Sequence, residues 1–171
     1  MSYDPRRPMH AVITTGLMVG FGFVIAMYGG TWLLIVPVMV ATLSAGSGAG
    51  LLVAILAHSL NIMRFEPSLS NISIMVIDIG IVVLLQTINY RMRMHYVYTS
   101  LYPVAIVCIL VRSVLIVFGT WIQSLFAPQA SLTQAPIDVL TMMLTGPALL
   151  MTVIAIVGVL VINMLLRQFL P

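Results

Sequence analysis

Three ionisable side chains stand inside apolar stretches of this chain, where a charge is hardest to keep. They are His58, Asp78 and Arg112, and each is surrounded by aliphatic residues in the sequence. An imidazole, a carboxylate and a guanidinium can pair with one another or hold a polar ligand. Whether these three meet depends on how the segments that carry them are arranged.

The composition places those segments in a lipid bilayer. The chain is 61% hydrophobic and 6% charged, whereas soluble domains carry roughly 25% charged residues. Its mean hydropathy is +1.17. The apolar runs are continuous, which favours helices over the alternating strands of a membrane barrel. We therefore expect an all-α, polytopic membrane helix bundle.

Span lengths follow from the thickness of the bilayer, since a helix needs about 20 residues to cross it. The stretch from Trp32 to Met63 is too long for one crossing, and the glycines of SAGSGAG divide it. The two short helices are either full spans or a re-entrant hairpin. Pro147 is expected to kink the last run or to break it after an interfacial piece. The prediction is one integral membrane domain over residues 1–171, with a cytoplasmic tail at 1–8 and about six spans: 9–28, 31–45, 48–63, 70–90, 97–125 and 137–167.

The arginines predict the orientation. With the N-terminus in the cytoplasm, Arg64 lies in an outer loop, and the inner side holds the following residues: Arg6, Arg7, Arg91, Arg93 and Arg167. This is a positive-inside distribution. We expect a multi-pass protein of the bacterial inner (cytoplasmic) membrane with both termini in the cytoplasm. Residues 91–95 then face inward and residues 127–136 outward.

This orientation brings the ionisable side chains into the outer half of the bundle. At 1.5 Å per residue, His58 lies roughly 7–8 Å and Asp78 roughly 10 Å below the outer ends of their helices. Arg112 lies near the middle and can extend outward. A charge at the membrane centre costs about 2.5–3.5 kcal/mol on insertion scales, and an Asp78–Arg112 pair would offset much of that. The predicted ligand-binding residues are His58, Asn61, Asp78 and Arg112.

A purely structural role for the same residues stays open. An Asp78–Arg112 pair can serve helix packing alone, and His58 can be a hydrogen-bonded packing histidine. The glycines are interpreted as packing residues. Gly16-x-x-x-Gly20 and Gly46-x-x-x-Gly50 have the spacing of close helix contacts, and Gly48 belongs to the same turn.

Other chemistries find no support in the sequence. The four acids show no pairing at helical spacing, and no His-x-x-x-His or His-Glu-x-x-His motif occurs. Cys108 is the single cysteine, so neither an internal disulfide nor a thiolate cluster can form. The arginines do not cluster as in a nucleic-acid-binding surface. We expect no enzyme, no metal, no cofactor and no nucleic-acid partner.

The stretch WLLIVPVMVATLSAGSGAGLLVAILAHSLNI, from Trp32 to Ile62, resembles the core of the LytS-type five-transmembrane receptor region. Pro37, Gly46 and Gly50 match its pattern of a proline, a Gly-rich turn and a small-residue helix. The resemblance implies a receptor-like sensory module that binds a small ligand from the outer side and signals to a partner.

Two alternatives come from other families of similar size. The chain resembles substrate-capture subunits of energy-coupling-factor vitamin transporters in its length, six helices and inner termini. That resemblance implies a ligand near the outer face and a transport partner docked on the Gly16 and Gly20 face. The chain also resembles MreD-like cell-shape scaffolds, which act by binding partner proteins and need no pocket. The expected partners are the lipid bilayer, a membrane protein or a second copy, and, in the first two cases, a small molecule.

Overall fold

The computed structural model describes residues 6–28, 30–65, 69–94, 101–125 and 146–169, and no strand occurs among them. The helices follow in chain order: α1 (Arg6–Met27), the 3-10 helix η1 (Thr31–Leu34), α2 (Ile35–Ala45), α3 (Ser47–Phe65), α4 (Leu69–Met94), α5 (Leu101–Leu125) and α7 (Pro147–Phe169).

Five of these helices are long and apolar enough to cross a membrane: Pro8–Met27, Ser47–Phe65, Ser70–Met92, Leu101–Gly119 and Ala148–Gln168. Their outward faces are also apolar, with exposed side chains such as Val12, Val76, Val107 and Val161. Helices that are apolar all round are typical of membrane spans. The all-helical prediction is confirmed, while the second predicted span corresponds to a shorter apolar helix, Thr31–Ala45.

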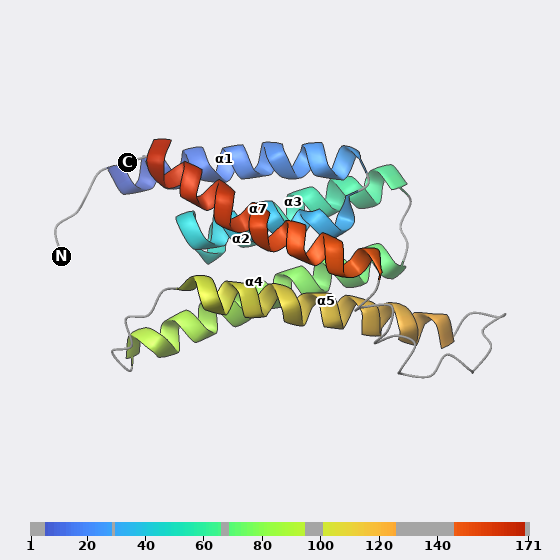
Figure 1. Ribbon diagram of the computed structural model, residues 1–171. Coiled ribbons are helices and arrows are strands. Elements are labelled where there is room, and N and C mark those ends of the chain that lie inside the picture. The colour runs from blue at the N-terminus through green and yellow to red at the C-terminus, as the bar shows by residue number, and fades with distance from the viewer. Residues whose placement is uncertain (1–5, 29, 66–68, 95–100, 126–145, 170–171) are drawn as a thin grey trace.

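Helix α2 lies at the centre of the bundle. Eight consecutive residues, from Ile35 to Thr42, are buried, and α2 contacts α1, α3, α4, α5 and α7. Figure 1 shows α4 and α5 side by side in one layer, with α1, α3 and α7 in the group above them. The side chains of this short helix therefore pack mainly against the other helices.

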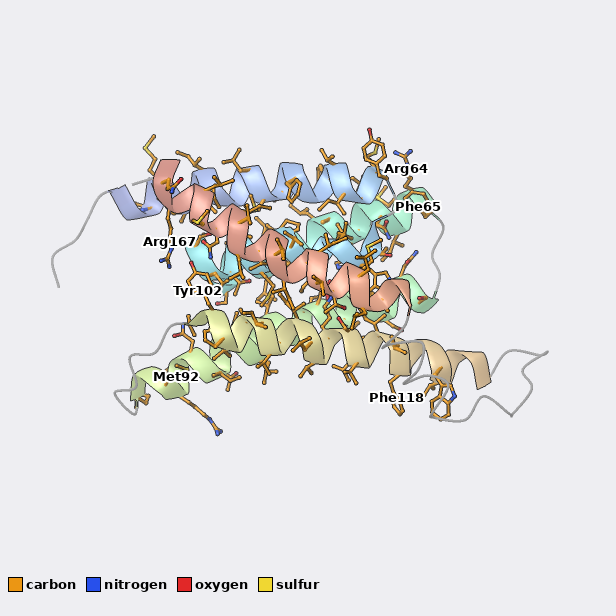
Figure 2. All side chains as sticks on the ribbon, in the orientation of Figure 1. Arg64, Phe65, Met92, Tyr102, Phe118 and Arg167 are labelled. Carbon is orange, nitrogen blue, oxygen red and sulfur yellow. The ribbon has the colours of Figure 1, made fainter. Side chains whose placement is uncertain are left out.

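The two ends of the bundle can be told apart by their arginines. Figure 2 shows Arg64 and Phe65 at one end, and Arg167 and Tyr102 at the other. The guanidinium carbon lies 5.5 Å from the ring centroid of Phe65 in the first pair and 5.2 Å from that of Tyr102 in the second. We name these the Arg64 end and the Arg167 end. Helix α1 begins and α7 ends at the Arg167 end (Figure 1).

The predicted break in SAGSGAG falls between α2 and α3. Gly46 ends α2 with a φ of +102°, a conformation that other residues rarely adopt. Gly50 then faces Thr42, because a Cβ on Gly50 would overlap the Thr42 hydroxyl and lie 3.0 Å from the Thr42 Cβ. The close approach of α2 and α3 therefore depends on Gly50.

The other predicted packing glycines are not in close contact within the chain. A Cβ on Gly16, Gly20 or Gly48 would meet nothing within 4 Å, and all three are exposed. Close packing of Gly16, Gly20 and Gly48 therefore stays a prediction. The close contact of α1 is made instead at Gly22, where a Cβ would lie 3.0 Å from the Ala57 Cβ.

The last described helix begins at the proline where the final predicted run was expected to kink or break. Helix α7 starts at Pro147, where proline is well suited because the first helical N–H needs no partner. Residues 137–145 of the predicted span lie outside the described residues, as do residues 1–5 of the predicted tail and the predicted outer segment 127–136.

Candidate functional site

His58, Asp78 and Arg112 meet inside the bundle, where they join α3, α4 and α5. The His58 Nε2 atom lies 2.8 Å from Asp78 Oδ2. Arg112 binds the same carboxylate with two nitrogens. Its Nε donates to Oδ1, and its Nη2 donates to Oδ2 at 3.1 Å. We call these three residues the buried triad.

Arg112 also hydrogen-bonds to the 3-10 helix η1. Its Nη1 donates to the Trp32 carbonyl at 3.0 Å, and its Nη2 donates to the Thr31 carbonyl at 3.3 Å. These bonds use four of the five guanidinium N–H groups. One side chain therefore connects α4, α5 and the segment that leads into the central helix α2.

The triad is closed to solvent and contains a direct ion pair between Asp78 and Arg112. His58, Asp78 and Arg112 are 0%, 0% and 1% exposed. The Asp78 carboxylate can only accept, so His58 Nε2 carries the proton of their bond. The carboxylate and the guanidinium then cancel, which is how a low-dielectric interior tolerates ions.

Helix order accounts for this meeting. Helices α3, α4 and α5 follow one another, and each contacts the next. His58 and Asp78 lie in the halves of α3 and α4 nearer the Arg64 end, and the long side chain of Arg112 reaches them from the middle of α5. The structure brings these three predicted residues together, and ligand binding by them stays a prediction.

Asn61, the fourth predicted site residue, is buried without a partner. It is 1% exposed, and neither its Oδ1 nor its Nδ2 has a hydrogen-bond partner in the described part of the chain. The same holds for His58 Nδ1. Residues three apart share a helix face, so these unpaired atoms lie one turn apart on α3. An unsatisfied buried polar group costs about 1–3 kcal/mol. A hydrogen-bonding molecule that pairs with His58 Nδ1 and the Asn61 amide would remove this cost.

A second polar contact was missed by sequence analysis. The hydroxyls of Ser113 and Thr152 lie 2.8 Å apart and join α5 to α7. Each hydroxyl also lies within hydrogen-bond distance of the carbonyl four residues earlier in its own helix. Serine and threonine in apolar helices commonly make such contacts, and their presence in apolar runs was the available signal.

A separate groove opens beside the α2–α3 turn, between α1 and α3. Its volume is about 610 Å³. Small side chains border it, and the lining residues are Ala11, Val12, Thr15, Gly16, Val19, Ala45, Gly48, Ala49 and Leu52. Two of the glycines that fail to pack within the chain, Gly16 and Gly48, therefore line an open surface.

Metal chemistry has no candidate in the part of the chain that the structure describes, where no group of three His, Cys, Asp or Glu side chains is gathered. In comparisons with protein-family models, curated proteins and solved structures, nothing matches this chain. Among the described residues, the candidate functional features are the buried triad, Asn61 and the groove.

Proposed function

We propose that this chain is a non-enzymatic, receptor-like membrane module that binds a small ligand near the Arg64 end and signals to a partner protein. The observation that carries the proposal is the set of buried, unpaired polar atoms on α3, namely His58 Nδ1 and the Oδ1 and Nδ2 atoms of Asn61. Buried polar atoms in native proteins are nearly always paired, and exceptions often mark sites of function or of a bound molecule.

The triad offers a route from ligand to signal. A ligand that bonds to His58 Nδ1 changes the electron density and position of the ring, and hence its bond to Asp78. Asp78 is held by Arg112, and Arg112 holds the Thr31 and Trp32 carbonyls of η1. A differential contact of this kind is what allows a ligand to shift a conformational equilibrium. The movement would reach α2 through η1.

Orientation and location belong to the same proposal. We place the Arg167 end in the cytoplasm and the protein in the inner membrane, because arginine-rich segments stay inside. Tyr28 and Tyr90 offer a matched test, since they are 88% and 64% exposed near opposite ends. In a Cys108→Ser background, an impermeant thiol reagent applied to intact cells should label Tyr28→Cys and spare Tyr90→Cys. The reverse pattern inverts the orientation.

Native mass spectrometry tests ligand binding directly. We expect wild-type protein, purified in mild detergent, to carry a small molecule that Asn61→Leu loses. Asn163→Leu is the control, because Asn163 is also 1% exposed with an unpaired Nδ2 but lies on α7. A wild-type protein without a bound small molecule, or equal occupancy in the Asn61 and wild-type proteins, would contradict the proposal.

The groove favours a second candidate, an assembly scaffold that binds a helix of another membrane protein. Gly16 lines the groove with open space where a side chain would begin, so Gly16→Ile fills it without a clash at Cβ. For a scaffold, we expect this variant to lose a native oligomer at unchanged melting temperature. The capture-subunit alternative predicts the ligand result above together with a partner ATPase.

A further inference from the structure

We infer that the ligand of the site formed by His58 and Asn61 is recognised through an uncharged hydrogen-bonding group, such as an amide or a hydroxyl, and not through a carboxylate or phosphate. The inference rests on the proposed function and names the class of molecule that the site accepts. It departs from the usual expectation that an arginine in a membrane site binds an anion.

Charge balance gives the first argument. The buried triad already contains one anion, Asp78, and one cation, Arg112, in direct contact. An anionic ligand would add a second negative charge beside residues that are at most 1% exposed. An unpaired charge in such surroundings is far more costly than an uncharged polar group. The site is therefore selective for neutral molecules.

The hydrogen bonds that Arg112 already makes give the second argument. Its N–H groups bind both Asp78 oxygens and the carbonyls of Thr31 and Trp32. An anion that took the guanidinium would displace one of these acceptors and leave it buried without a donor. That exchange removes as many strong bonds as it makes, so Arg112 is a structural partner and not the contact for a ligand.

The unpaired atoms describe the group that fits. In a neutral imidazole with its proton on Nε2, His58 Nδ1 is an acceptor and needs a donor, whereas the Asn61 amide offers both a donor and an acceptor. An amide or hydroxyl supplies a donor for Nδ1 and can pair with Asn61 as well. Asn61 also lies closer than His58 to the end of α3 at Phe65.

Two probes of matched size separate the charged from the uncharged group. Hexanamide and hexanoate share an alkyl tail and differ in the charge of the head. We expect hexanamide at saturating concentration to raise the melting temperature of the detergent-purified protein by about 2–4 °C. The shift should vanish in Asn61→Leu and persist in Asn163→Leu, and hexanoate should produce none. Asn61→Ala serves as a second variant if the leucine variant does not fold.

The outcomes distinguish this inference from the function on which it rests. An Asn61-dependent shift with hexanoate would overturn the neutral-ligand inference and leave the ligand-binding proposal intact. Absence of a hexanamide shift, or a shift that survives in Asn61→Leu, would also overturn it. A wild-type protein that carries no small molecule in native mass spectrometry instead counts against the proposed function itself.

Discussion

Helix α3 contacts its neighbours through polar side chains near one end and through a glycine near the other. Near the Arg64 end, His58 joins a carboxylate and a guanidinium, so long side chains bridge helices through charge and hydrogen bonds. At the other end, Gly50 faces Thr42, so absence of a side chain lets two helices approach. A single helix thus combines polar and steric packing.

The comparison shows which kind of packing a sequence reveals. A charge in a membrane helix must find a partner, because an unpaired charge is too costly. Only a few side chains in the apolar runs can pair with a carboxylate, so the partners of Asp78 can be inferred from the sequence. A glycine satisfies several needs, including turns, close approach and simple helix packing. Its spacing therefore does not say which face is used.

The largest effect is expected from separating the charges. Asp78→Asn or Arg112→Gln alone leaves an isolated charge in a buried site and should destabilise the protein by about 3–5 kcal/mol. The double variant should recover much of that loss. A double-mutant cycle on unfolding free energy in detergent measures the coupling. Strictly additive losses would show that the two side chains do not interact.

A smaller loss is expected at the glycine end. Gly50→Ala places a Cβ against Thr42, and overpacking of this kind costs about 1–3 kcal/mol. Gly48→Ala is the matched control in the same helix, because its Cβ enters open space and alanine favours the helix. Thermal unfolding of the two variants compares them. Equal destabilisation would mean that the Gly50–Thr42 contact does not hold α2 against α3.

Removal of the unpaired amide should have the smallest effect and the opposite sign. Asn61→Leu replaces an unsatisfied buried polar group with an apolar one of similar size, so ligand-free protein should gain about 1 kcal/mol. Melting of wild-type and variant protein after exhaustive delipidation and washing provides the measurement. A loss of stability in the variant would indicate that Asn61 makes a structural bond, and its assignment to a ligand would fail.

Particular residues show how far the sequence alone leads. Long apolar runs predicted the spans because hydrocarbon thickness fixes helix length, and the glycine-rich stretch predicted the break at Gly46. The central place of α2 was not predicted, because a continuous apolar run suits a membrane span as well as a helix enclosed by protein. The bonds from Arg112 to the Thr31 and Trp32 carbonyls were also missed, because backbone acceptors carry no signature in the sequence.

The protonation of His58 tests the central claim most directly, because a neutral imidazole with a free Nδ1 is what makes the site uncharged. The chain has three histidines, so the signals absent from a His58→Gln sample identify those of His58 in ¹⁵N-histidine NMR spectra. At neutral pH we predict a neutral ring with its proton on Nε2 and an unprotonated Nδ1. A ring protonated on both nitrogens would give the triad a net positive charge, and the preference for an uncharged ligand would be refuted.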